Sequence, residues 1–126
     1  MKVMLDTTFV IDYLRRNPEA VGRLRSIYET GDDPLVTSVV VSEAWSGVVA
    51  ATDGSLDEFL QYFEYVHPGP ATSRLAGTWR AEARRGGRTI SISDALIGAT
   101  AFDQGAAILT RNVRDFALMP VRVETY

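Results

Sequence analysis

Apolar residues occur along this chain in two patterns: short unbroken runs, and longer stretches in which they recur every three or four positions. The short runs predict buried strands, and the recurring pattern predicts amphipathic helices. Strands are expected at residues 3–5, 35–36, 65–66, 107–110 and 121–123. Helices are expected at 9–15, 18–30, 39–51, from Ser55 onward, at 70–85, and from the turn before Asp94 to Gln104.

The alternation of these elements predicts a single α/β domain over residues 1–126. Parallel strands need crossover connections, so we expect a central, mostly parallel sheet of about four or five short strands with helices on both faces. Thr8 and Ser38 are expected to be the N-caps of the helices that follow them. Residues 39–41 are β-branched and favour a strand, which leaves the start of the helix at 39–51 open.

Four acidic residues follow a strand, open a helix or interrupt an apolar helix. Asp6 directly follows the first strand, and Asp115 comes just after the strand at 107–110. Asp94 lies in the first turn of its helix, on an apolar face. Glu43 lies in a helix that is apolar nearly all round, where an unpaired carboxylate would cost several kcal/mol. Each of the four also has an ordinary alternative, as a helix cap, a partner of the helix dipole or a surface residue.

Taken together, these carboxylates predict a metal site. Ligands bind at the carboxyl ends of the strands in open α/β sheets, so Asp6, Glu43, Asp94 and Asp115 are expected to converge there. Clustered carboxylates repel one another unless cations neutralise them. Oxygen ligands without histidine or cysteine favour Mg²⁺ or Mn²⁺, and such ions activate water and stabilise the oxygens of a phosphoryl displacement.

The composition of the chain excludes several kinds of active site. The chain has no cysteine, and its single histidine, His67, lies in a turn-like H-P-G-P segment, so thiol chemistry and histidine-based sites are not expected. No apolar run reaches the roughly 20 residues of a membrane span and no signal peptide opens the chain, so we expect a cytoplasmic protein without a membrane partner. The net charge is −3, yet twelve of the 13 basic residues are arginines, which suit phosphate partners.

Four segments of the chain resemble the PIN-domain ribonucleases, and in particular the VapC toxins of bacterial VapBC toxin–antitoxin pairs. They are MLDTTFVIDYL, SVVVSEAWSG, ISISDALIGATA and ILTRNVRDF. The resemblance covers essentially the whole chain. It implies that the acidic quartet of the family corresponds to Asp6, Glu43, Asp94 and Asp115. It also implies that three polar residues support the quartet: Thr8, Thr110 and Asn112.

The same resemblance implies metal-dependent cleavage of RNA by a toxin that forms a homodimer and that a cognate VapB-like antitoxin holds inactive. The antitoxin is expected to cover the acidic pocket with an arginine or lysine and to contact apolar side chains such as Tyr13 and Trp45, although Trp45 alone fits a core residue better. Asp12 is expected to pair with Arg16, outside the site. RNA phosphates are expected to bind arginines that flank the pocket: Arg74, Arg80, Arg84, Arg85, Arg88, Arg111 and Arg114.

Two other functions fit parts of the pattern. Aspartyl-phosphate chemistry also places an aspartate after the first strand, but it relies on a lysine, and Lys2 lies roughly 13 Å back along the same strand. The second alternative is a catalytically inactive PIN-like module that binds RNA or protein. Nuclease activity that disappears in the Asp94→Asn variant would separate an enzyme from such a module.

Overall fold

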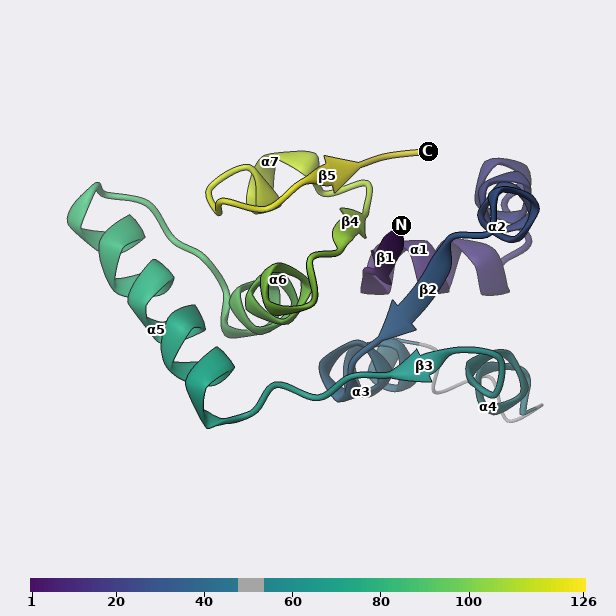
Figure 1. Ribbon diagram of the computed structural model, residues 1–126, viewed down its shortest axis with the longest axis horizontal. Helices are drawn as coiled ribbons and strands as arrows, with labels where there is room; N and C mark the ends of the chain where they lie inside the picture. The colour runs from purple at the N-terminus through teal and green to yellow at the C-terminus, as the bar shows by residue number, and fades with distance from the viewer. Residues whose placement is uncertain (48–53) are drawn as a thin grey trace.

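The centre of the structure, a computed structural model that describes residues 1–47 and 54–126, is a parallel sheet. Within these residues it has five strands in the order β3-β2-β1-β4-β5 (Figure 1). The strands are β1 (Lys2–Leu5), β2 (Asp33–Val36), β3 (Glu64–Tyr65), β4 (Ala107–Leu109) and β5 (Val123–Glu124). The first strand lies in the middle because β2 pairs with it on one side and β4 on the other.

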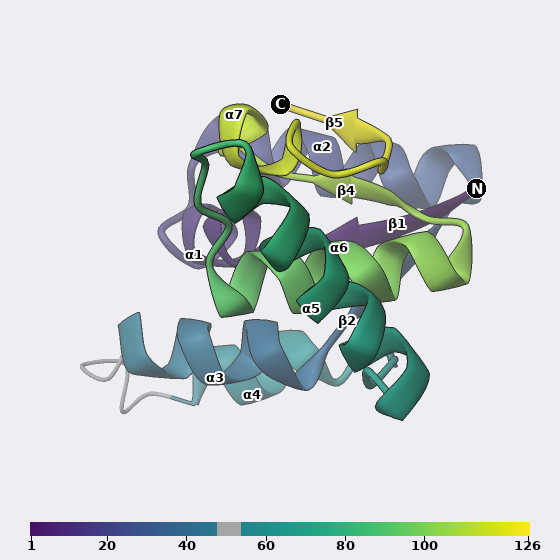
Figure 2. The same ribbon diagram turned by 90° about the vertical axis from the view of Figure 1, so that its left-hand side faces the viewer.

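Helices connect all of these strands, as a parallel sheet requires. They are α1 (Thr7–Leu14), α2 (Pro18–Thr30), α3 (Ser38–Gly47), α4 (Ser55–Leu60), α5 (Pro70–Arg85), α6 (Ile92–Gln104) and α7 (Val113–Phe116). The helices α5 and α6 cover one face of the sheet, and α2 lies on the other (Figure 1 and Figure 2). Figure 2 also shows α1, α7 and the turn before α6 together at one end of the molecule, beyond the carboxyl ends of β1 and β4.

Capping side chains explain where two of these helices begin. The Asn17 side chain accepts hydrogen bonds from two backbone N–H groups in the first turn of α2, at 3.0 and 3.1 Å. The Ser91 hydroxyl accepts a hydrogen bond from the backbone N–H of Asp94 at 3.0 Å, which fixes the first turn of α6. The helix α2 ends at Gly31, whose φ of 76° is in the left-handed region that glycine adopts most readily.

The α/β architecture confirms the predicted fold, but both predicted caps are wrong. Thr8 lies inside α1, and Asp6 is in the N-cap position of that helix. Ser38 is the first residue of α3. The hydroxyl of Thr37 accepts a hydrogen bond from the backbone N–H of Val40 at 3.3 Å. Residues 39–41 are helical in spite of their β-branched side chains, because Val40 is fully buried and Val39 and Val41 pack against the core from α3.

Several element boundaries also differ from those predicted. The short helix α7 was not predicted, and β5 begins at Val123 instead of at residue 121. The last four residues of the helix predicted at 39–51 lie outside the described residues. The helix predicted at 70–85 agrees with α5 (Pro70–Arg85).

The core lies around β1, β4 and α6. Val3, Met4 and Leu5 of β1 have no exposed surface, and α6 packs against both β1 and β4. Gly98 lets α6 lie close to the segment after α7, because a Cβ at this position would come within 2.7 Å of the sulfur of Met119. Among the residues that the structure describes, no helix is both long enough and apolar enough to cross a membrane.

Candidate active site

Asp6 lies at the carboxyl end of β1 and is almost fully buried, with 2% of its surface exposed. Its backbone N–H donates to the carbonyl of Leu109 at 3.1 Å, which joins the ends of β1 and β4. Its Oδ2 accepts hydrogen bonds from the hydroxyls of Thr110 at 2.7 Å and Thr8 at 2.9 Å. Burial raises the pKa of Asp6, whereas these hydrogen bonds and others from the backbone of Thr7 and Thr8 oppose the rise.

The two hydroxyls around Asp6 have no further proton to donate. A hydroxyl carries one proton, and Thr8 and Thr110 both donate theirs to Asp6, so the 3.3 Å contact between the two hydroxyl oxygens adds no further hydrogen bond. As acceptors, Thr8 Oγ1 takes the backbone N–H of Arg111 at 3.3 Å, and Thr110 Oγ1 takes that of Asn112 at 2.9 Å. Asp6 is therefore tied through its threonines to the main chain that follows β4.

Glu43 lies on α3 and accepts a hydrogen bond at Oε1 from the hydroxyl of Thr7, 2.7 Å away on α1. This bond was not predicted. The expectation of an apolar, buried helix around Glu43 is also wrong, because only Val40 and Ala44 are buried along α3. Glu43 is half-buried, and the Thr7 hydroxyl holds its carboxylate beside α1.

Asp94 lies in the first turn of α6 and is half-buried. Its pKa is raised to about 6, first by burial and then by the negative charge of Asp6; a hydrogen bond with the Ser91 side chain opposes the rise, and the charges of Asp115 and Glu43 add to it. The other three acidic residues of the predicted quartet are thus close enough for their charges to act on Asp94. The apolar face predicted around Asp94 is present, since Ile97 and Gly98 are buried.

Asp115 lies on α7 and is exposed. Although the charges of Asp6, Glu43 and Asp115 act on Asp94, no three acidic, histidine or cysteine side chains in the described ranges are close enough together to enclose a metal ion. These two observations are compatible, because charges interact over greater distances than the bonds between a metal and its ligands. The candidate site therefore has one fixed acidic residue, Asp6, and three less constrained acidic residues around it.

The three predicted supporting residues have different roles. Thr8 and Thr110 bond directly to Asp6, whereas Asn112 contributes its backbone N–H and makes no side-chain capping bond to α7. Thr7, which lies next to Thr8 and bonds to Glu43, was not among the predicted site residues. Only the neighbouring pair of threonines after Asp6 hinted at a role for it.

The predicted RNA-binding arginines divide into two groups. Arg80 donates from Nε to the carbonyl of Ile90 at 3.0 Å, and Arg111 forms ion pairs with Asp12 and Glu19, so both bond within the fold. Asp12 pairs with Arg111 and not with Arg16, contrary to expectation. The remaining predicted arginines are exposed: Arg74, Arg84, Arg85, Arg88 and Arg114.

The position of Lys2 bears on the alternative of aspartyl-phosphate chemistry. Lys2 begins β1, and its Nζ donates to the side chain of Gln104 at 3.4 Å, at the end of α6. Asp94, in contrast, is at the beginning of α6, where the charge of Asp6 acts on it. Lys2 is therefore held away from Asp6 and cannot neutralise a phosphoryl group there.

Fold and candidate site together define an α/β protein with acidic residues gathered at the carboxyl edge of a parallel sheet. A family model for the PIN domain matches residues 3–120. Ribonuclease VapC19 of Mycobacterium tuberculosis is 30% identical to this chain over 117 residues, which are 93% of this chain and 94% of that protein. The chain therefore belongs to the PIN domain family and, within it, to the VapC ribonucleases.

Solved structures share the fold over the full length. VapBC2 from Rickettsia felis, bound to a DNA fragment from its promoter, matches with a TM-score of 0.88 at 22% identity and covers 100% of this chain and 99% of that one. DNA-bound VapBC from Salmonella typhimurium matches with a TM-score of 0.72 at 25% identity and covers 99% of this chain and 98% of that one.

Proposed function

We propose that this chain is a metal-dependent endoribonuclease toxin of a type II toxin–antitoxin system. Its catalytic and metal-holding residues would be Asp6, Glu43, Asp94 and Asp115. The observation that carries the proposal is the coupling at Asp94, whose pKa is raised by burial and by the charges of the other three residues. Coupled carboxylates at the carboxyl edge of a parallel sheet oppose folding on their own, and they favour the binding of a cation.

The oxygen atoms of the quartet fit Mg²⁺ or Mn²⁺, and the chain has no cysteine that would favour a softer metal. Mg²⁺ commonly keeps several waters and binds through one or two carboxylates together with substrate phosphates, so it does not need three side chains already closed around it. When bound, the metal would supply an activated water and would stabilise the phosphodiester oxygens during an in-line displacement.

Each of the four acidic residues would have a different role in holding the metal and the proton. Asp6 would be the fixed member, because two hydroxyls and the end of β1 orient it. Glu43 would be oriented by Thr7 from the neighbouring helix. Asp94, with a pKa of about 6, is the member that can hold or release a proton near neutral pH when no cation is bound. Asp115 would add its charge from α7.

The direct test is RNA cleavage by the Asp94→Asn variant with Mg²⁺ or Mn²⁺. Loss of a metal-holding carboxylate removes several kcal/mol of transition-state stabilisation, so single-turnover cleavage should fall about a thousandfold. Asp103→Asn is the matched control, because Asp103 is exposed near the other end of the same helix. Equal cleavage by wild type and Asp94→Asn would favour the inactive binding module.

Cation binding has its own test, without RNA. Mg²⁺ or Mn²⁺ should raise the melting temperature, because a cation relieves the repulsion within the quartet, and EDTA should reverse the rise. A variant that carries both Asp6→Asn and Asp94→Asn should lose most of this response. A response that persists in the double variant would place the metal elsewhere.

We further propose that the exposed arginines bind the RNA phosphates: Arg74, Arg84, Arg85, Arg88 and Arg114. A net charge of −3 gives the whole chain little attraction for RNA, so local cations have to supply it. Substitution of two or three of them by methionine should weaken RNA binding and flatten its salt dependence, with metal affinity unchanged. An unchanged salt dependence of RNA binding would show that these arginines do not bind the RNA phosphates.

The partner that we propose is a VapB-like antitoxin, because the solved relative from Salmonella typhimurium is a VapBC complex. A groove of about 360 Å³ between α1, α2 and α4 offers apolar side chains to a partner helix. Its lining includes Tyr13, Leu24, Phe59 and Tyr62. Tyr62 is 71% exposed, as an unoccupied docking residue would be. Trp45, expected as a core residue, is 52% exposed on α3 and could also contact a partner.

Co-expression tests the partner. The chain alone should arrest growth, and the product of an adjacent small reading frame should restore it. Tyr62→Glu should prevent this rescue, because a charge would enter the groove, whereas Gln61→Glu, an exposed neighbour outside the lining, should not. Arrest that is equally strong in Asp94→Asn would mean that toxicity does not come from RNA cleavage. We also propose a homodimer, to be measured by sedimentation, and the cytoplasm as the place of action.

A further inference from the structure

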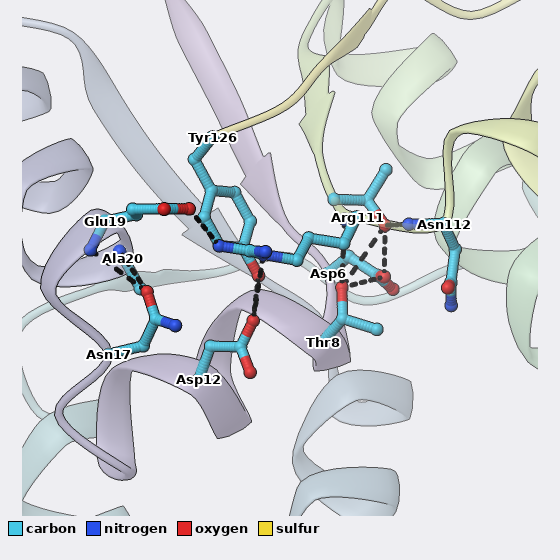
Figure 3. Close-up of polar contacts among 10 residues, drawn as sticks. Asp6, Thr8, Asp12, Asn17, Glu19, Ala20, Arg111, Asn112 and Tyr126 are labelled. Atoms are coloured by element: carbon cyan, nitrogen blue, oxygen red, sulfur yellow. Dashed lines mark hydrogen bonds and ion pairs between the residues drawn. The ribbon is translucent and has the colours of Figure 1, made fainter.

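The main chain of Arg111 belongs to the acidic site, but its side chain turns away from that site. Arg111 lies between Thr110 and Asn112, and its backbone N–H donates to Thr8 Oγ1 at 3.3 Å. Figure 3 shows the guanidinium on the side away from Asp6, among the side chains of three other elements. The side chain of Arg111 therefore has a role other than contact with the acidic residues of the candidate site.

Four side chains form the cluster that we name the clamp: Asp12, Glu19, Arg111 and Tyr126. Arg111 Nε lies 3.2 Å from Asp12 Oδ2, and Arg111 Nη2 donates to Glu19 (Figure 3). The guanidinium carbon lies 4.5 Å from the centre of the Tyr126 ring. The Tyr126 hydroxyl donates to the same oxygen of Asp12 at 2.7 Å. The clamp thus joins the loop after β4 to α1, to the start of α2 and to the segment after β5.

The clamp is stronger than an isolated surface ion pair, which is a weak constraint. The Tyr126 ring packs edge-on against Phe9, which has no exposed surface, with their centroids 5.2 Å apart. Arg111 thereby combines a charge-assisted hydrogen bond to Glu19, an ion pair with Asp12 and a cation–π contact on a ring that is fixed to the core. Two carboxylates also compensate the single guanidinium, so an RNA phosphate would have to displace them to bind Arg111.

The segment fixed by the clamp, residues 110–116, carries two residues of the candidate site, Thr110 and Asp115. Asn112 N–H donates to Thr110 Oγ1 at 2.9 Å and leads directly into α7, which carries Asp115. A helix of four residues has little stability of its own. Phe116, which is fully buried, secures its far end, and Arg111 connects its near end to α1 and α2.

We infer that Arg111 is a positioning residue that, through the clamp, sets the Thr110 hydroxyl and the Asp115 carboxylate relative to Asp6. This inference rests on the proposed function. It assigns Arg111 a role opposite to the one expected from its sequence neighbourhood, because the side chain acts on the protein and not on RNA. Its removal should therefore alter the metal site without altering RNA affinity.

The test uses Arg111→Met in the full chain. Mn²⁺ affinity, measured by calorimetry without RNA, should fall about tenfold, as for other residues that orient metal ligands. Amide exchange of residues 112–116 in EDTA should become faster, and RNA affinity in EDTA should stay within twofold of wild type. In cleavage assays kcat should fall with KM nearly unchanged, and Arg111→Lys should restore part of the loss. Arg114→Met provides the contrast, with weaker RNA binding and normal Mn²⁺ affinity.

The inference is wrong if Arg111→Met weakens RNA binding and lowers its salt dependence while Mn²⁺ affinity and amide exchange stay normal. It is also wrong if none of these quantities changes. Should Arg111→Met fail to fold, Tyr126→Phe removes one hydrogen bond of the clamp and should produce a smaller change in the same direction. A wild-type chain that binds no divalent cation would overturn the proposed function, whereas amide exchange in EDTA would still decide whether the clamp fixes α7.

Discussion

Asp6 and Asp94 are both carboxylates withdrawn from water, and their surroundings give them different properties. Burial raises the pKa of Asp6, but hydrogen bonds from Thr8, Thr110 and the backbone oppose the rise. Asp94 has one opposing hydrogen bond, from Ser91, and its pKa is raised further by three negative charges. The comparison shows that hydrogen-bond donors and neighbouring charges, and not burial alone, determine how readily a carboxylate stays ionised.

Thr110→Val should make Asp6 resemble Asp94, and it has the largest expected effect. The valine keeps the shape of threonine but removes a donor from the buried carboxylate, which should reduce stability by about 1–3 kcal/mol. Because Thr110 orients a proposed metal ligand, Mn²⁺ affinity should also fall about 10–100-fold. Chemical denaturation and calorimetry would measure the two effects.

Thr100→Val is the matched control for this prediction. Thr100 is also buried, but its hydroxyl donates to the carbonyl of Leu96 within α6, at 2.7 Å. Its substitution should leave Mn²⁺ affinity unchanged. Equal losses of affinity in the two variants would mean that the hydroxyl of Thr110 has no special part in orienting Asp6.

The pH dependence of stability tests the other half of the comparison. The folded pKa of Asp94 is raised from 3.8 to about 6, so the folded chain binds an additional proton between these values. Without metal, stability should therefore fall as pH rises from about 4 to about 6 and should stay low above that range. Asp94→Asn should remove this decline and add about 1 kcal/mol at pH 7, a value reduced for the partial exposure of Asp94.

Urea denaturation in EDTA at pH 4.5 and pH 7 would measure this difference. Asp103→Asn, on the same helix but exposed, should leave the decline in place. If Asp94→Asn loses as much stability between pH 4.5 and pH 7 as wild type does, the group that titrates is not Asp94.

Thr7→Val extends the comparison to Glu43 and has the smallest expected effect. Glu43 is only half-buried and loses a single hydroxyl donor, so stability should fall by about 0.5–1.5 kcal/mol and RNA cleavage only a few-fold. Thr89→Val, at an exposed position, should change neither quantity. A loss as large as that of Thr110→Val would show that Glu43 is as tightly constrained as Asp6.

Much of the fold could be predicted because its strands and longer helices have strong local signals. The apolar run of β4 and the cap signals of α5, with Pro70 at its start and glycines after Arg85, are visible in the sequence. The helix α7 could not be predicted, because four residues are too few to show a helical period. Trp45 was wrongly assigned to the core, because the sequence does not tell which face of α3 packs against α1 and α6.

The polar contacts of the site were harder to predict than its acidic residues. The positions of Asp6 and Asp94 follow from strand ends and helix starts, which are local features. The bond from Thr7 to Glu43 joins residues 36 positions apart, and that from Tyr126 to Asp12 joins residues 114 positions apart. Such pairs depend on how helices and termini meet in space, and no period or cap in one sequence specifies that.

The threonine network around Asp6 has a consequence for substitutions of that aspartate. Every proton in the network is donated in one direction, from the amides of Arg111 and Asn112 to the two hydroxyls and from the hydroxyls to Asp6 Oδ2. An asparagine can keep the bonds to both threonine hydroxyls, because its amide oxygen can accept the two hydroxyl protons. Asp6→Asn should therefore keep the local structure while it removes the charge, which would make it a folded, inactive form suited to capturing uncut RNA.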